Sequence, residues 1–67
     1  MILILAGNAD EFHKYVIANR LNRRDVVYMS NIDVVRGRVF DSVVVVGTFE
    51  NRRDDHELKT AARRAVR

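Results

Sequence analysis

Two short runs of uninterrupted apolar residues, each ended by a glycine, constrain the fold of this chain more than any other feature. Residues 2–6 read ILILA and stop at Gly7, and residues 43–46 read VVVV and stop at Gly47. A strand with one face in water alternates apolar and polar side chains, and neither run alternates. Both runs therefore predict strands that are covered on both faces, as in a parallel sheet with helices on its two sides.

A helix-like pattern follows each glycine. The spacing of apolar residues predicts a first helix that begins with Asn8 or Asp10 as its N-cap and ends near residue 22. A polar connection then leads to a second helix over residues 54–65. The apolar stripes expected to face the sheet comprise Phe12, Val16, Ile17 and Leu21 in the first helix and Leu58, Ala61, Ala62, Ala65 and Val66 in the second.

The middle of the chain supplies one more strand and one ambiguous segment. Residues 26–29 read VVYM, and this β-branched and aromatic run predicts a strand. Residues 32–36 predict a short helical turn that Ser30 or Asn31 caps. The alternative is that residues 32–40 form a hairpin arm beside the valine run. We favour the helical turn.

The order strand, helix, strand, short helical turn, strand, helix predicts one small α/β domain over residues 1–67. With the two long helices on opposite faces, right-handed crossovers place the first strand in the middle of a three-stranded, mostly parallel sheet in the order 2-1-3. Such a sheet leaves two short apolar edges that invite pairing with another chain. The chain is small and has no cysteine, so association would add the stability that disulfides cannot. We therefore predict a homo-oligomer.

Several classes of protein are disfavoured by what the sequence lacks. Neither the G-x-G-x-x-G nor the G-x-x-x-x-G-K-[ST] phosphate-binding motif occurs. The two histidines, His13 and His56, have no metal-ligand spacing, and the expected helix starts explain the acidic residues there. The N-terminal apolar stretch is too short for a signal peptide or a membrane span. We predict a cytoplasmic, non-enzymatic protein with no membrane contact, no catalytic residues, no cofactor and no metal.

Two groups of residues remain candidates for binding. Beyond the carboxyl ends of parallel strands, where ligands collect, polar loop residues would meet a small anion or a nucleotide. This ligand crevice comprises Gly7, Asn8, Asp10, Ser30, Gly47 and Thr48. The net charge is +3, from 12 basic and 9 acidic residues, and some of the basic residues share one face of the last helix and the segment before it. This basic face, which suits nucleic acid or an acidic partner, comprises Arg52, Arg53, Lys59, Arg63 and Arg67.

One segment resembles part of a known family. Residues 36–46 read RGRVFDSVVVV. This is similar to the approach to the second nucleotide-motif strand of phage helicase-type P-loop proteins, where R-G-x-x-F-D-x and four apolar residues precede Asp-Glu. The resemblance implies a parallel, Rossmann-like core strand, and Gly47 and Thr48 in place of the acidic pair imply that NTP hydrolysis is absent. In size and in arginine and valine usage the chain also resembles small α/β proteins encoded by phages of high-G+C bacteria, which would place it in the host cytoplasm.

The functional interpretation that we favour is a small non-enzymatic α/β protein. It would act by self-association and by binding another macromolecule, a protein such as a host protein, in a phage-type accessory or host-modulating role. Two alternatives stay open. One is a nucleic-acid-binding accessory protein that uses the basic face, and the other is a binder of small anions or nucleotides in the ligand crevice.

Overall fold

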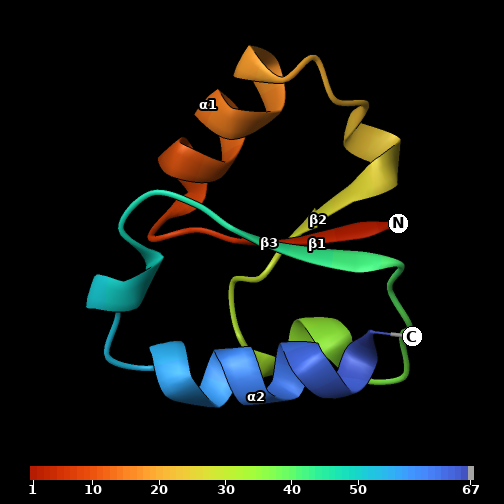
Figure 1. Ribbon diagram of the computed structural model, residues 1–67, viewed down its shortest axis with the longest axis vertical. Coiled ribbons are helices and arrows are strands. Elements are labelled where there is room, and N and C mark those ends of the chain that lie inside the picture. Colours follow the sequence, from red (N-terminus) through yellow and green to blue (C-terminus); the bar gives the residue numbers. More distant parts are fainter. Residues whose placement is uncertain (67) are drawn as a thin grey trace.

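The computed structural model describes residues 1–66 and confirms the predicted α/β fold (Figure 1). Three parallel strands form one sheet in the order β2-β1-β3, so the first strand of the chain is the central one. The helices and strands are β1 (Ile2–Leu5), α1 (Ala9–Ala18), β2 (Val26–Tyr28), β3 (Ser42–Val45) and α2 (Asp55–Ala65). Three short 3₁₀ turns connect them, namely η1 (Arg23–Asp25), η2 (Ile32–Val35) and η3 (Phe49–Asn51).

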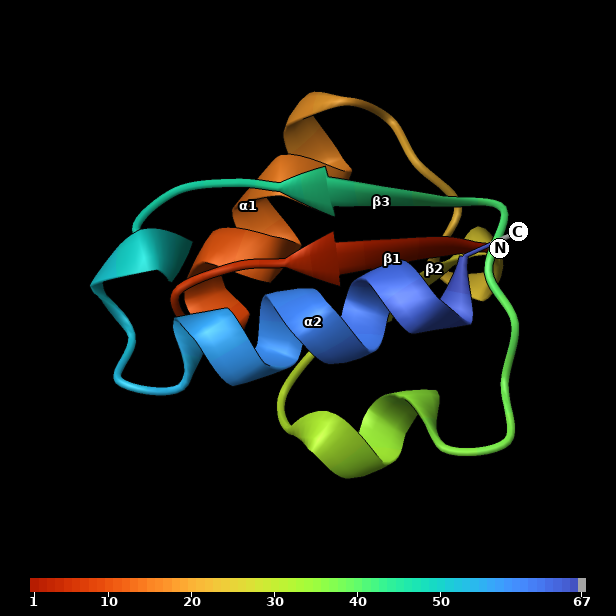
Figure 2. The ribbon, with the colours of Figure 1, turned by 60° about the horizontal axis from the view of Figure 1, so that its bottom comes forward.

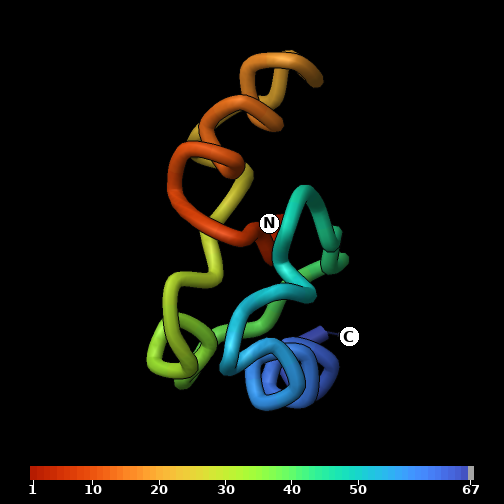
Figure 3. Tube along the Cα trace, turned by 90° about the vertical axis from the view of Figure 1, so that its left-hand side faces the viewer, coloured from red at the N-terminus to blue at the C-terminus, as the bar shows by residue number. Residues whose placement is uncertain are grey.

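The two long helices lie on opposite faces of the sheet, with η2 beside α2 (Figures 1 and 3). On the α1 face the buried cluster comprises Ile4, Ala6, Val16 and Val26. On the α2 face a larger cluster comprises Leu3, Leu5, Met29, Phe40, Phe49, Leu58, Ala62 and Ala65. β1 contributes alternate residues to both clusters, which explains why its sequence is apolar without a break.

The second apolar run is less covered than predicted. β3 lies at an edge of the sheet, beside β1 in parallel register (Figure 2). Val43 and Val44 are only half-buried, and Val45 is 45% exposed. The prediction of a strand covered on both faces is therefore right for β1 and wrong for β3, because an edge strand has a neighbour on one side only.

The first helix is shorter than predicted. α1 ends at Ala18, and Arg20 then turns the chain with a φ of 53°. This turn lets the Leu21 N–H donate to the Val16 carbonyl at 2.9 Å, which brings Leu21 back toward the core. Ile17, predicted in the apolar stripe, is 70% exposed, because consecutive helical residues point about 100° apart and Val16 takes the inward direction.

The ambiguous segment is a helical turn, as favoured. The Asn31 side chain caps η2 by accepting the Asp33 N–H at 2.9 Å. The hairpin alternative does not form. Instead the Phe40 N–H donates to the Ala65 carbonyl at 2.8 Å, which joins the segment before β3 to the end of α2.

Candidate functional site

At the carboxyl ends of β1 and β3, one carboxylate joins two loops. The Glu11 side chain accepts hydrogen bonds from the Gly7 N–H at 2.8 Å, the Thr48 N–H at 3.0 Å and the Thr48 hydroxyl at 3.0 Å. A Cβ on Gly7 would overlap this carboxylate and the Thr48 hydroxyl. Gly47 has a φ of +59°, and a Cβ there would lie 2.6 Å from Glu11 Cδ. The glycines that end the two apolar runs therefore border the same contact.

The local sequence explains how Glu11 reaches this position. Asn8 is the N-cap of α1, and its side-chain oxygen accepts the Glu11 N–H at 2.9 Å. A glutamate three residues after the N-cap turns its carboxylate back toward the N–H groups before the helix, as in a capping box. Here the carboxylate binds the Gly7 N–H and also crosses to Thr48. The spacing from Asn8 to Glu11 was the available signal, but the contact with Thr48 has no local signature.

A guanidinium occupies the other half of the same edge of the sheet. Arg52 Nη1 donates to the Ala6 carbonyl at 3.2 Å and to the Met29 carbonyl at 3.1 Å, and Nη2 donates to the Ser30 carbonyl at 3.0 Å. Nε and Nη2 also bind the Asp54 carboxylate at 2.9 and 3.0 Å. The Arg52 side chain is 16% exposed. Its five hydrogen bonds link the chain just after β1, just after β2 and just before α2.

The side chains of Glu11 and Arg52 already bind much of the predicted ligand crevice. Its members Gly7, Gly47 and Thr48 are brought together, but the N–H groups of Gly7 and Thr48 that would bind an anion already donate to Glu11. The Ser30 carbonyl accepts a hydrogen bond from Arg52. Of the other crevice residues, Asn8 caps α1 and Asp10 pairs with Lys14. The arrangement is suited to locking loops together, and we propose no small ligand there.

The Glu11 contact makes a prediction about acid stability. Its pKa lies below the ordinary value of 4.5, mainly because of the Thr48 backbone N–H; partial burial opposes this shift, and the Thr48 hydroxyl and the Gly7 N–H add to it. A lowered folded-state pKa stabilises the fold above the unfolded value, and this stabilisation is lost as the pH falls through the folded-state value. Glu11→Gln should therefore lower stability near neutral pH and flatten the acid side of the stability profile.

Urea denaturation at a series of pH values from about 7 down to about 3 measures this effect. Asp41 also has a lowered pKa, because its side chain binds the amino terminus. In Glu11→Gln the dependence of the unfolding free energy on pH should therefore become weaker but not vanish. Glu57→Gln is the matched control, since it makes the same change at an exposed position in α2, away from the Glu11 contact. An unchanged acid slope in Glu11→Gln would contradict the expected role of the carboxylate.

The described members of the predicted basic face make different contacts in the structure. Arg52 is turned inward, as described above, and Lys59 Nζ binds the Glu50 carboxylate at 2.7 Å. Arg53 and Arg63 are exposed. Arg67 lies outside the described residues. Two of the five predicted cations are thus committed to contacts within the chain, which weakens the case for a continuous phosphate-binding stripe.

A groove runs between the free edge of β3 and α2. Its volume is about 210 Å³, and it is lined by Leu5, Val43, Val45, Lys59, Ala62 and Arg63. The floor is apolar, and the wall contributed by α2 carries two cations. The sequence predicted both the open edge and the basic helix face, but not that they border one groove.

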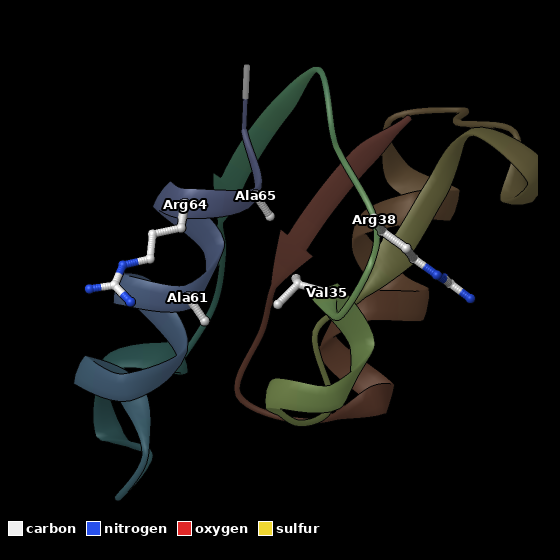
Figure 4. Close-up of a pocket in the computed structure, with 5 residues that line it drawn as sticks. All are labelled: Val35, Arg38, Ala61, Arg64 and Ala65. Carbon is white, nitrogen blue, oxygen red and sulfur yellow. The ribbon is translucent and has the colours of Figure 1, made fainter.

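A second groove, of about 250 Å³, lies on the other flank of α2 (Figure 4). Val35 of η2 and Ala61 and Ala65 of α2 point toward one another across it, while Arg38 and Arg64 extend away to opposite sides. Neither of these two arginines is directed into the gap between the apolar side chains (Figure 4). This groove therefore gives less indication of the chemistry of a partner than the groove beside β3.

Within residues 1–66, no three or more histidine, aspartate or glutamate side chains gather in a way that could hold a metal ion. None of the helices in that part of the chain has the length and apolar character needed to cross a bilayer. Comparisons of the chain with protein-family models, with curated proteins and with solved structures gave no match.

Proposed function

We propose that this protein is a binding protein, not an enzyme, and that another polypeptide adds a strand to the free edge of β3. The observation that carries the proposal is the edge itself. Among the described residues, β3 pairs with β1 alone, and its last residue, Val45, is 45% exposed. An exposed apolar edge strand is a template for pairing with a further strand.

The register supports this use of the edge. The Val46 N–H donates to the Leu5 carbonyl at 2.8 Å. Because successive strand residues direct their backbone groups to opposite edges, Val44 also faces β1, and Val43 and Val45 direct their N–H and C=O groups outward. The side chains of these same two valines line the groove beside α2. An added strand would therefore find hydrogen-bonding groups and apolar surface at the same residues.

Self-association is one case of this proposal, in which a second copy of the chain supplies the added strand. A second copy would place its own β3 against the first, so that two three-stranded sheets become one continuous sheet. Such pairing would cover Val45 in both copies. It would also supply the additional buried surface that a domain of this size lacks.

Val45→Glu is expected to abolish strand addition, because a charged side chain on an edge strand opposes further pairing. Two measurements test this on the intact chain: light scattering over a range of protein concentrations, and selection of short peptides from a displayed library. Val39→Glu, at a position that is 58% exposed in the loop before β3, is the matched control. Circular dichroism checks that both variants fold.

The proposal expects an assembly or a family of selected peptides that is lost in Val45→Glu and kept in Val39→Glu. A wild-type chain that stays monomeric and selects no peptide would overturn it. Peptides that bind Val45→Glu as well as the wild type would do the same.

A further inference from the structure

We infer that the strand received by β3 is an extended acidic segment of another protein, with glutamate or aspartate at alternate positions. This inference rests on the proposed function and names the chemistry of its partner. It follows from the charge on the wall of the groove, from the spacing of that charge, and from a comparison with the other possible occupants.

The wall of the groove is positively charged. Lys59 and Arg63 line it together with the valines of β3. Lys59 is already paired with the Glu50 carboxylate at 2.7 Å. Arg63 is exposed, and no carboxylate of residues 1–66 lies within salt-bridge distance of its guanidinium. A carboxylate held at the outer side of β3 would therefore meet an uncompensated cation.

The spacing of the two cations fits a strand. Lys59 and Arg63 are four residues apart in α2, which corresponds to about 6 Å along the helix axis. Alternate residues of a strand lie about 6.6 Å apart and point to the same face. Of two acidic side chains at alternate positions of an added strand, one would thus reach Arg63, and the other would reach Lys59 and share it with Glu50. The aliphatic stems of glutamates would cover Val43 and Val45.

The same charge disfavours a second copy as the occupant. Antiparallel pairing of two β3 strands places both α2 helices on the same face of the joined sheet. The flanks of the two helices would then face each other across the seam, each with an Arg63 that no carboxylate of residues 1–66 pairs with. Like charges brought together oppose association, whereas an acidic strand neutralises them.

Nucleic acid is disfavoured for a different reason. A nucleic-acid site neutralises several phosphates with free cations, and Arg52 is turned inward at 16% side-chain exposure. The outward N–H and C=O groups of Val43 and Val45 match another polypeptide backbone. Their apolar side chains offer nothing to a phosphate.

Fluorescence anisotropy tests the inference with two matched peptides, one alternating glutamate with threonine and the other carrying glutamine in place of each glutamate. We expect the glutamine peptide to bind at least about fivefold more weakly at low salt, with the difference shrinking as salt screens the charges. In NMR spectra, the backbone amide chemical shifts of Val43 and Val45 should change when the peptide is added, which would mark the site of binding. Arg63→Gln should weaken binding of the glutamate peptide, and Arg53→Gln, which removes the same charge outside the groove, should not.

The inference would be overturned by equal affinity for the two peptides or by equal weakening by Arg63→Gln and Arg53→Gln. A stable dimer that occupies the β3 edge and excludes the glutamate peptide would also overturn it. An oligonucleotide that binds more tightly than the glutamate peptide, and is weakened by both arginine variants, would assign the charge to nucleic acid instead. The displayed library could instead select peptides that lack acidic residues and whose binding is lost when Val45 is replaced. That result would remove this inference and leave the proposed function intact.

Discussion

Replacing Phe49 with alanine is expected to leave much of the protein unfolded at physiological temperature. Phe49 is completely buried, at 0% exposure, among the side chains of the α2 face. Truncating a buried phenylalanine to alanine lowers the free energy of unfolding by about 3–5 kcal/mol. A chain of 67 residues has a total of only about 3–10 kcal/mol, at roughly 0.05–0.15 kcal/mol per residue. This single substitution therefore removes a large part of the available stability.

Thermal unfolding followed by circular dichroism measures the effect. For a domain of this size, 1 kcal/mol changes the melting temperature by about 4–8 °C, so Phe49→Ala should lower it by about 15 °C or more. Phe49→Leu, which keeps most of the apolar volume, should fall between this variant and the wild type. Val39→Ala is the control, because Val39 is 58% exposed. A Phe49→Ala variant that melts within about 5 °C of the wild type would show that η3 contributes little to the core.

Phe49 also illustrates which parts of the fold local sequence could reveal. β1 was predictable, because its unbroken apolar run already implies burial on both faces. The caps at Asn8 and Asn31 were predictable, since a capping side chain binds N–H groups two or three residues away. Phe49 lies in a polar connection with no periodic pattern around it. Its burial depends on a cluster whose members range from Leu3 of β1 to Ala65 of α2, so no short stretch of sequence contains its neighbours.

The exposure of Ile17 and Val45 was missed for the converse reason. Both belong to apolar patterns that are typical of buried segments, and the sheet is too small to cover every apolar side chain. Ile17 points away from the sheet once α1 settles on Val16. Val45 is exposed because no fourth strand follows β3 within the described residues. The sequence predicted an open edge, and only the assembled fold shows that this edge and the basic flank of α2 form one groove.

The contacts at the carboxyl ends of the strands were the least predictable part of the candidate site. Glu11 binds Thr48 across 37 positions, and Arg52 binds the Ala6 carbonyl across 46. In the sequence, the spacing from Asn8 to Glu11 indicates a capping box but not the contact with Thr48, and Arg52 cannot be told from a surface arginine beside Arg53. Their roles arise because parallel strands bring their carboxyl ends to one edge of the sheet. There, free N–H and C=O groups need partners.

Arg52→Ala is the second substitution from which we expect a large loss of stability, about 2–4 kcal/mol. The guanidinium makes three hydrogen bonds to carbonyls and two to the Asp54 carboxylate. Removing it leaves the Ala6 and Met29 carbonyls without this donor and Asp54 without its cation. The guanidinium carbon also lies 5.8 Å from the centre of the Phe49 ring, so the ring loses a neighbour at the same time.

Urea denaturation compares this variant with two others. Arg53→Ala removes the adjacent, exposed arginine and should change stability by no more than about 0.5 kcal/mol. Arg52→Lys keeps the charge but cannot reproduce the forked contacts with carbonyls and carboxylate together, so it should recover only part of the loss. Because Arg52 fixes the chain just before α2, its removal should also weaken binding of the acidic peptide at β3, even where the variant remains folded. Equal stability of Arg52→Ala and Arg53→Ala would show that the inward guanidinium adds nothing beyond a surface charge, and full recovery by Arg52→Lys would show that charge alone suffices.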